Sequence, residues 1–362
     1  MKILFFIDNM GSGGAQRRVA NLAVLLKKAG HEIKLLVYGK QDFFYEKLNE
    51  NNIQIDIVGE KNYFQRFFKV RKYIRKGWQD VVISFLDTPN FLSNISSIKK
   101  RKWKIITNEC NANIKKFSGI KNRIYKYFEK KSDALVCNSN NAKRMWIDHY
   151  PEYKDKIQVI YNPVDAVCED NYQTRKNGKT EIVVAARYEK QKNIDNLLEA
   201  LIILPDSFKE KIIISWYGGA RNEPDGSSEY EKAIKKITLH KLGNVIKLIG
   251  ETKEIYSAMK TADIVGLFSS REGMPNAICE AMFLSKPIIM TRVSDFEILI
   301  DENNGFLCDW DNPASITEAL KKTTVKTDEE LIKMGEYSKT KAKKLFATKK
   351  IINEWLELIN GV

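Results

Sequence analysis

The stretch "KILFFIDNMGSGGAQRRVANLAVLLKKAGHEIKLLVYG", residues 2–39, decides the fold of the N-terminal half. Both of its ends are short runs of apolar and β-branched residues, which are typical of strands. Between them, apolar residues recur at helical spacing from Gly14 until Gly30 ends the helix. A strand, a helix and a second strand at this spacing predict a parallel sheet with crossover helices.

The same alternation continues to the end of the chain. Further strands are predicted at 80–87, 103–109, 133–139, 181–188, 211–219, 245–251, 262–270, 286–293 and 305–310. The segment "IQVIYNPVD" (157–165) ends in Asn-Pro and precedes a polar stretch, which predicts a domain boundary. We expect α/β architecture with two doubly wound domains, residues 1–163 and 164–344. One long amphipathic helix (339–360) would carry residues 345–362 back to the first domain.

Length and composition fit this organisation. The chain has 362 residues, too many for one ordinary core. No apolar run reaches the roughly 20 residues of a membrane-spanning helix, and the N-terminus lacks the pattern of a signal peptide. Its five cysteines are scattered and odd in number, which favours reduced thiols. We therefore expect a cytoplasmic protein.

The positive charge is concentrated in one segment. The chain has a net charge of +14, and residues 61–131 hold 19 Lys/Arg against four acidic residues, a net +15. Aromatic residues interleave with the basic ones. Such a surface suits nucleic acid, an anionic bilayer or a phosphorylated substrate, or it is only a solvated basic face.

A glycine-rich loop joins the first strand to the first helix. Backbone N–H groups of Gly11, Ser12, Gly13 and Gly14, with the helix dipole, are suited to receive an anion. The sequence argues against the dinucleotide fingerprint G-x-G-x-x-G, because Gln16 occupies its third glycine position. The second strand also ends without the acidic residue that would hold a ribose. A tight turn that binds nothing remains the alternative.

In the second half, chemically suited residues follow successive strands. Arg187 and Lys192, in "AARYEKQKN", are placed to hold a diphosphate. Gly218 and Gly219 follow the next strand, where a close backbone approach is expected, and Gly250 follows the one after. These ends all lie at the edge of a parallel sheet where ligands bind.

The stretch "SSREGMPNAICEAM", residues 269–282, carries two glutamates. Its pattern predicts a helix from Asn276 to Met282, with Glu272 on the preceding loop and Glu280 two turns into the helix. Backbone N–H groups of residues 273–277 would then face an anion. The alternative is that Glu272 caps the helix while Glu280 faces solvent. Beside the two glutamates, the expected ligand contacts are Ser270, Gly273, Met274, Pro275, Asn276 and Ala277.

In this order the residues resemble the family-4 retaining glycosyltransferases, which have the GT-B fold. The family's E-x7-E motif corresponds to Glu272 and Glu280, its diphosphate pair to Arg187 and Lys192, and its N-terminal glycine loop to residues 11–15. The resemblance covers essentially the whole chain. It is greatest to enzymes that extend lipid-linked oligosaccharides or bacterial surface polysaccharides.

The resemblance implies two Rossmann-like domains facing across a cleft, and a hexosyltransferase that retains anomeric configuration. The donor, expected to be a UDP-sugar, would bind to the second domain. Glu280 would hold the ribose, Arg187 and Lys192 the diphosphate, and Glu272 with the following backbone the sugar. The acceptor would be a lipid-linked oligosaccharide or a surface polysaccharide precursor, met by the first domain.

One departure from the family concerns a histidine. Many members have a histidine after the first-domain strand that corresponds to residues 103–109, and none of this chain's three histidines lies there. Asn108, Glu109 or Asn111 is expected to replace it at the donor sugar. The resemblance also implies no cofactor and no metal. The D-x-D at 309–311 precedes a predicted helix, so Asp311 or Asn312 is more simply the N-cap of that helix.

Two other functions stay open at this point. A nucleotide-sugar epimerase or a phosphorylase would share the fold, but would need a catalytic histidine or a cofactor lysine. A nucleic-acid-binding protein is suggested by charge alone and leaves the motif order unexplained. For the transferase, residues 61–131 would rest on the anionic cytoplasmic face of the membrane as a peripheral contact, with no nucleic-acid partner.

Overall fold

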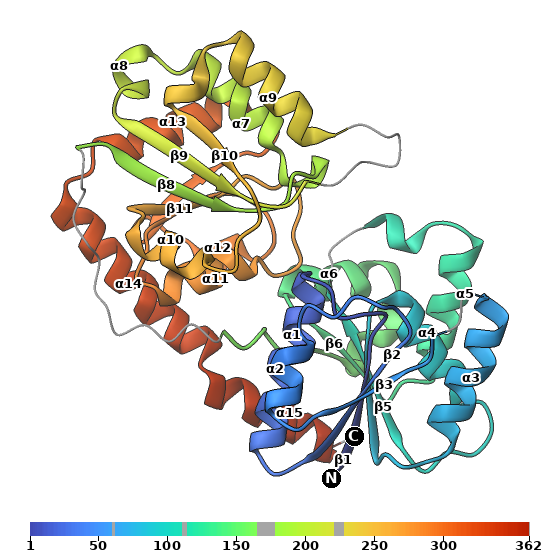
Figure 1. The fold of residues 1–362 in the computed structure, drawn as a ribbon. Coiled ribbons are helices and arrows are strands. Elements are labelled where there is room, and N and C mark those ends of the chain that lie inside the picture. Colours follow the sequence, from blue (N-terminus) through green and yellow to red (C-terminus); the bar gives the residue numbers. More distant parts are fainter. Residues whose placement is uncertain (60–61, 111–113, 165–177, 221–227, 362) are drawn as a thin grey trace. The chain divides into compact units, whose positions relative to one another are not determined.

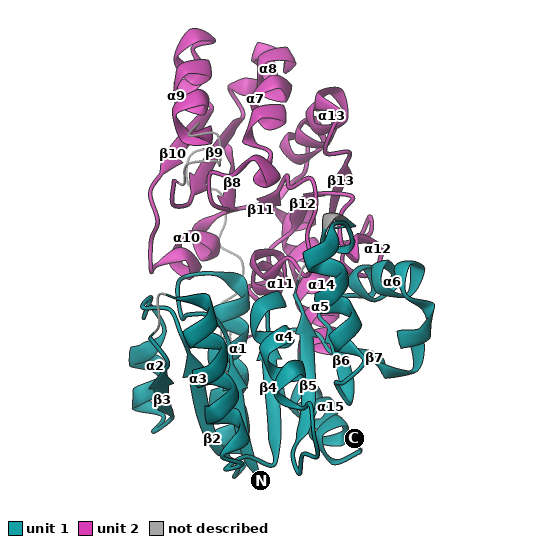
Figure 2. Ribbon diagram, turned by 90° about the vertical axis from the view of Figure 1, so that its right-hand side faces the viewer, with its two compact units in different colours: residues 1–163, 347–362 teal, residues 164–346 magenta. Residues whose placement is uncertain are grey.

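The computed structural model describes residues 1–59, 62–110, 114–164, 178–220 and 228–361. The chain divides into two compact units, coloured separately in Figure 2. Unit 1 comprises Met1–Pro163 and Ala347–Val362, and unit 2 comprises Val164–Phe346. Figure 1 labels the elements of both units. No helix among the described residues has the length and apolar character needed to cross a bilayer.

Unit 1 contains a sheet whose described strands are all parallel, in the order β3-β2-β1-β4-β5-β6-β7. The strands are β1 (Lys2–Phe6), β2 (Glu32–Val37), β3 (Gln54–Ile57), β4 (Val81–Phe85), β5 (Lys104–Glu109), β6 (Ala134–Cys137) and β7 (Ile157–Val159). All but β3 and β7 lie in segments predicted as strands, and β7 lies in the segment 157–165 that was predicted only as a domain boundary. The edge strand β3 has only four residues, none fully buried, so it lacks an apolar run that the sequence would reveal.

Helices cover both faces of this sheet, as Figure 1 shows. They are α1 (Gly14–Lys28), α2 (Tyr45–Glu50), α3 (Tyr63–Arg75), α4 (Asp87–Ser96), α5 (Ile120–Glu129), α6 (Asn140–His149) and α15 (Thr348–Gly361), with the short 3-10 helices η1 (Ile114–Phe117) and η2 (Pro151–Lys156). Along β1, Phe5 packs in one core cluster with Trp355 of α15, whereas Phe6 packs in another with residues of α3 and α5. This alternation follows from the two-residue period of a strand.

Unit 2 repeats the architecture with a parallel sheet in the order β10-β9-β8-β11-β12-β13. Its strands are β8 (Thr180–Ala185), β9 (Ile212–Tyr217), β10 (Ile246–Ile249), β11 (Ile264–Leu267), β12 (Ile288–Thr291) and β13 (Gly305–Cys308). Its helices are α7 (Ile194–Ile203), α8 (Asp206–Lys209), α9 (Glu229–Leu239), α10 (Ile255–Thr261), α11 (Asn276–Phe283), α12 (Phe296–Leu299), α13 (Pro313–Thr324) and α14 (Asp328–Phe346), with η3 (Lys190–Lys192) and η4 (Leu242–Asn244). Each strand lies in a segment predicted from the sequence.

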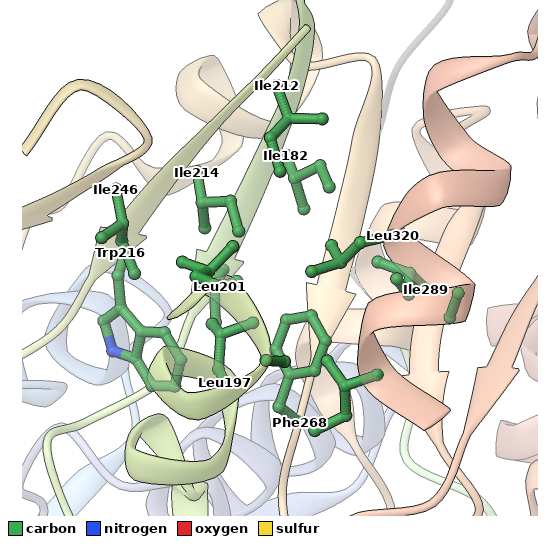
Figure 3. Close-up of a cluster of buried hydrophobic side chains, with 14 of the residues drawn as sticks. Ile182, Leu197, Leu201, Ile212, Ile214, Trp216, Ile246, Phe268, Ile289 and Leu320 are labelled. Carbon is green, nitrogen blue, oxygen red and sulfur yellow. The ribbon is translucent and has the colours of Figure 1, made fainter. Parts of the chain in front are cut away.

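The core of unit 2 is a cluster of buried branched and aromatic side chains between its sheet and helices. Figure 3 shows Trp216 of β9, Leu197 and Leu201 of α7, Leu320 of α13, and Phe268, which follows β11, within this cluster. All five are inaccessible to solvent or nearly so. Burying such side chains contributes roughly 1.5–3 kcal/mol each, so this cluster holds the strands that position the candidate site.

The prediction of one long C-terminal helix is wrong. Helix α14 ends at Phe346 and α15 begins at Thr348. The apolar face of α14, including Phe346, is buried in unit 2, whereas Trp355 and Ile359 of α15 belong to the core of unit 1. Because the apolar faces of α14 and α15 pack into different units, the helix is interrupted between them at Ala347.

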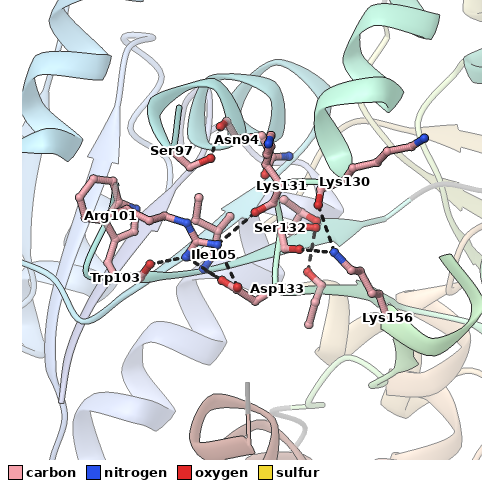
Figure 4. Close-up of polar contacts among 12 residues, drawn as sticks. Asn94, Ser97, Arg101, Trp103, Ile105, Lys130, Lys131, Ser132, Asp133 and Lys156 are labelled. Atoms are coloured by element: carbon pink, nitrogen blue, oxygen red, sulfur yellow. Dashed lines mark hydrogen bonds and ion pairs between the residues drawn. The ribbon is translucent and has the colours of Figure 1, made fainter. Parts of the chain in front are cut away.

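Part of the basic segment serves the fold of unit 1. Figure 4 shows Arg101 paired with both carboxylate oxygens of Asp133 at 2.8 and 2.9 Å, while Asp133 also accepts from the backbone N–H of Ile105. Nearby, Lys156 donates to the carbonyl oxygens of Lys130 and Ser132 at 3.1 and 3.0 Å. Arg101 therefore joins the starts of β5 and β6, and its charge does not belong to a free basic surface.

Candidate functional site

The motifs of unit 2 follow two neighbouring strands at the point where the strand order reverses. From β8 the chain builds outward through β9 and β10, then returns to place β11 on the other side of β8. Arg187 follows β8, and the stretch 269–282 follows β11. Such a switch point is where ligands bind to open parallel sheets.

The structure brings Lys192 and Glu272 together across 80 positions of sequence. The Lys192 Nζ lies 2.6 Å from Glu272 Oε1, and both side chains are largely buried, at 18% and 10% exposed. Their loops are also joined through Gln191, whose carbonyl accepts from the Ser270 N–H at 2.8 Å and from the Ser270 hydroxyl at 3.2 Å. The amide of Gln191 donates to the Arg271 carbonyl. The ion pair and these hydrogen bonds therefore join the two loops to each other.

Helix α11 begins where the sequence predicts, at Asn276, with Pro275 at its N-cap. Glu272 lies on the preceding loop, so that prediction is confirmed. Glu280 is 4% exposed, which excludes the alternative that it faces solvent. The positive end of the helix dipole therefore lies beside the loop of the Lys192–Glu272 pair, a place suited to an anion.

The remaining predicted residues of this edge have mixed surroundings. Gly273 and Met274 are buried, and the Gly273 carbonyl accepts from the Ser294 hydroxyl. Pro275 is buried, whereas Asn276 and Ala277 are half-buried. Arg187 keeps about a third of its side chain exposed and lies 3.2 Å from Glu189 through its Nε. Arg187 thus has both a local carboxylate partner and access to solvent.

The glycines after β9 and β10 differ in what they contact. A Cβ at Gly218 would lie 2.0 Å from the Ala186 carbonyl oxygen, so no other residue fits there. The close backbone approach predicted at this position exists, and it is to the neighbouring strand. At Gly219 a Cβ would meet the Glu251 carboxylate at 3.3 Å, whereas Gly250 faces open space.

Hydrogen bonds from neighbouring residues to the side chains of Asp8 and Asn9 hold the glycine loop of unit 1. Asp8 accepts from the Asn9 N–H at 2.7 Å and from the Gln16 amide at 3.3 Å, and Asn9 accepts from the Gly11 N–H at 2.9 Å. Burial raises the pKa of the Asp8 carboxyl, and these hydrogen bonds offset part of the rise. Ser12 lies between the glycines, and α1 begins at Gly14 after Gly13 without a side-chain cap.

Asn108 and Glu109 are both buried at the end of β5. The Asn108 amide donates to the Ser84 carbonyl at 3.1 Å. The Glu109 carboxylate accepts from Lys116 at 2.6 and 2.7 Å and from the Trp146 indole at 3.2 Å. Asn111, the third predicted replacement for the histidine, lies outside the described residues.

A charged network around Glu109 was not predicted from the sequence. Lys116 Nζ also lies 3.1 Å from Asp87, whose carboxylate is 3.5 Å from Lys126. Burial would raise the pKa of the Asp87 carboxyl, but Lys116 and then Lys126 bring it below its ordinary value. The Asp87 side chain remains 40% exposed, so it is the solvent-facing member of this network.

Backbone strain marks the same position. Leu86, which precedes Asp87 at the end of β4, has φ +74° and ψ 157°. This region is nearly restricted to glycine and costs about 1–3 kcal/mol for other residues. Since β1 and β4 are the strands between which the order of the unit 1 sheet reverses, the strain lies at its switch point. The sequence signal that could have pointed to Asp87 is the segment "FLD", in which an acidic residue ends a predicted strand.

The described residues contain no group of three or more His, Cys, Asp or Glu side chains arranged to hold a metal. Within the D-x-D segment, Asp309 pairs with Arg292 at 2.7 Å, and the neighbouring Asn312 caps α13 by accepting from the Ser315 N–H. The helix-cap interpretation is confirmed. Cys110, Cys137, Cys279 and Cys308 are free thiols, and Cys168 lies outside the described part of the chain.

Comparison with known proteins agrees with these two units. The family described as "Glycosyltransferase Family 4" matches residues 12–167, and "Glycosyl transferases group 1" matches residues 169–341. The chain is 25% identical, over all of its length and 99% of the relative's, to a GalNAc-alpha-(1->4)-GalNAc-alpha-(1->3)-diNAcBac-PP-undecaprenol alpha-1,4-N-acetyl-D-galactosaminyltransferase of Campylobacter jejuni. A second C. jejuni relative, an N-acetylgalactosamine-N,N'-diacetylbacillosaminyl-diphospho-undecaprenol 4-alpha-N-acetylgalactosaminyltransferase, is 22% identical over 99% of this chain and 100% of its own.

Among solved structures, Anabaena HepE in complex with UDP and glucose superposes with a TM-score of 0.85, at 17% identity and over 100% of both chains. This likeness shows the GT-B fold. The two family matches together span residues 12–341 and divide between the two units. The chain therefore belongs to the glycosyltransferases, with a family 4 N-terminal domain and a group 1 C-terminal domain.

Proposed function

We propose that this glycosyltransferase moves a sugar from a UDP-sugar to a lipid-linked oligosaccharide or surface polysaccharide precursor, with retention of configuration. The observation that carries the donor assignment is the Lys192–Glu272 pair beside the start of α11 at the switch point of unit 2. The acceptor class is supported by the C. jejuni relatives, whose names specify undecaprenol diphosphate substrates.

The donor diphosphate would lie at the positive end of α11. Lys192 would exchange its Glu272 partner for a phosphate oxygen, and Arg187, which is partly exposed, would supply a planar fork of donors. The loop 273–277 would contribute backbone N–H groups. A ligand of charge −2 then replaces one carboxylate as the partner of Lys192, which favours binding of the diphosphate.

The two glutamates would hold different parts of the donor. Once Lys192 turns to phosphate, the Glu272 carboxylate is free to accept from sugar hydroxyls. Glu280, buried two turns into α11, would accept from the ribose hydroxyls. Gly219 and Gly250 would lie beside the donor, whereas Gly218 and Ser270 would position the loops around it, because Gly218 packs on the Ala186 carbonyl and Ser270 donates to Gln191.

Retention would follow from attack on the same face as the leaving group. The bond between the anomeric carbon and the diphosphate oxygen breaks while the acceptor oxygen bonds to that carbon. The acceptor hydroxyl proton passes to the departing diphosphate, and Arg187 and Lys192 stabilise its developing charge. This route requires no carboxylate nucleophile and no metal, so Glu272 acts as a ligand of the sugar.

Unit 1 would receive the acceptor through the glycine loop and the end of β5. In this assignment Glu109 acts by fixing Lys116, and Asn108 acts by holding the end of β4 through the Ser84 carbonyl. Asp87 would present a carboxylate at the edge of the sheet. The basic segment 61–131 would place the enzyme peripherally on the anionic cytoplasmic face of the membrane. This location gives access to a lipid-linked acceptor.

Thermal denaturation with a panel of nucleotides tests the donor assignment. UDP and UDP-sugars are expected to raise the Tm of the wild type, and GDP-sugars to raise it less. Lys192→Ala should reduce the shift, whereas Lys190→Ala, on the same turn, should not. If no nucleoside diphosphate or nucleotide sugar changes the Tm, the proposed function is wrong.

A further inference from the structure

Helices α3 and α5 of unit 1 enclose an apolar groove that the sugar-transfer chemistry does not use. The groove has a volume of about 710 Å³, within the roughly 300–1,000 Å³ range of ligand sites. Its apolar lining includes Phe64, Phe67 and Phe68 from α3 and Ile120 and Ile124 from α5. Lys121 is the charged residue in its lining.

The large apolar side chains at the rim of this groove are mostly exposed to solvent. Phe64 is 73% exposed, Phe68 64% and Ile120 79%. The floor is ordered by contrast, because Phe91 of α4 stacks on Tyr125 of α5 with ring centroids 4.3 Å apart. A contiguous exposed apolar surface over a packed floor marks a binding surface rather than scattered apolar residues.

A cationic hollow adjoins the apolar groove and shares Phe68 with it. This second hollow, of about 520 Å³, is lined by Phe68 and by Arg71, Lys72, Arg75 and Lys76. The two arginines donate to carbonyl oxygens at the end of α4, whereas Lys72 and Lys76 are exposed. The pair of hollows therefore presents an apolar slot beside two accessible ammonium groups.

We propose that this double hollow binds one anionic phospholipid of the bilayer, with an acyl chain in the apolar groove and the phosphate at Lys72 and Lys76. The charge complementarity is the reason for choosing this occupant: an apolar chain joined to a phosphate matches both halves. The inference rests on the proposed membrane location and adds a specific lipid site to it. Nucleic acid fits less well, since the stacked Phe91 and Tyr125 are buried, at 9% and 7% exposed, and offer no accessible face to a base.

Binding of short-chain lipids below their micelle concentrations tests the site directly. Calorimetry would compare dihexanoylphosphatidylglycerol, dihexanoylphosphatidylcholine and glycerol 3-phosphate with the full-length protein. The anionic lipid should bind at least about tenfold more tightly than either of the others, equivalent to about 1.4 kcal/mol. The choline lipid lacks the net charge, and glycerol phosphate lacks the chains.

Surface variants separate the two halves of the site. Phe64→Ser with Ile120→Ser should reduce binding of the anionic lipid to the level of glycerol phosphate. Lys72→Ser with Lys76→Ser should reduce it to the level of the choline lipid. The matched control is Lys235→Ser with Leu239→Ser on α9 of unit 2, where both residues are exposed.

The outcomes distinguish this inference from the proposed function. Equal affinity for all three probes, or unchanged lipid binding in the groove variants, overturns the lipid site. Displacement of the lipid by farnesyl diphosphate at far lower concentration would assign the groove to the acceptor chain, and displacement by an oligonucleotide would assign it to nucleic acid; either result contradicts the proposal. Because no donor is present, a failure of sugar transfer leaves this measurement intact.

Discussion

The two sheet edges of this molecule use buried ion pairs differently. In unit 2, Lys192 and Glu272 meet on loops that follow adjacent strands, and both belong to motifs predicted to bind a ligand. In unit 1, Glu109 was predicted as a ligand residue, but its carboxylate is occupied by Lys116 and the Trp146 indole. A carboxylate at the carboxyl edge of a sheet can therefore serve either a substrate or the fold.

The largest expected effect breaks the unit 1 pair. Glu109→Ala leaves Lys116 without its closest partner, and removing one member of a buried ion pair costs about 3–5 kcal/mol. Urea denaturation should show this loss in the free energy of unfolding of unit 1. The double variant Glu109→Gln with Lys116→Met should recover part of it. If the free energy of unfolding falls by less than about 1 kcal/mol, the Glu109–Lys116 pair contributes little to the fold, and its contrast with the ligand-binding pair of unit 2 is lost.

Glu272→Ala, unlike Glu109→Ala, should lower activity rather than the free energy of unfolding. Sugar transfer is expected to fall by about 10²–10³-fold, the range seen when one preorganised polar contact to a transition state is removed. Affinity for bare UDP should not fall, because Glu272 is assigned to the sugar and its removal leaves Lys192 available to the phosphate. Glu302→Ala, an exposed acid of unit 2, is the control. Unchanged transfer in Glu272→Ala would return Glu272 to a structural role like that of Glu109.

Glu280→Gln should reduce affinity for UDP by about tenfold, or about 1.4 kcal/mol, since the amide keeps the shape but loses the charge facing the ribose. Turnover at saturating donor should fall less than affinity does. Isothermal titration with UDP and with UMP measures the first effect. A similar loss of affinity for UMP and for UDP supports the ribose assignment, because both ligands carry the ribose; equal UDP affinity in both proteins contradicts it.

The smallest effect concerns acid stability. The folded-state pKa of Asp87 is lowered, so its contribution to stability is present above its unfolded pKa of about 3.9 and is lost as the pH falls through the folded value. Between pH 5 and pH 2.5, Asp87→Asn should therefore lose less stability than the wild type. Urea midpoints across this range measure the difference, with exposed Asp155→Asn as control. Parallel curves for Asp87→Asn and the wild type would refute the assignment.

The sequence could predict the sheets because their evidence is local. Apolar runs ending in glycine or polar residues predicted the strands of both units, except the short strands β3 and β7. The Lys192–Glu272 convergence could also be predicted, because both residues follow strands at the same edge. Side-chain partners chosen by packing could not: nothing near Glu109 in sequence shows that Lys116 and Trp146 will converge on it. The break at Ala347 depends on two separate cores and has no local signal either.

Hydrogen–deuterium exchange with and without UDP tests the central claim, that unit 2 holds the donor through the Lys192–Glu272 loops. Saturating UDP should protect backbone amides most strongly in residues 187–193 and 270–283, and Lys192→Ala should weaken that protection. Unchanged exchange of these segments with UDP bound, together with protection of the glycine loop at 9–16, would contradict donor binding by unit 2.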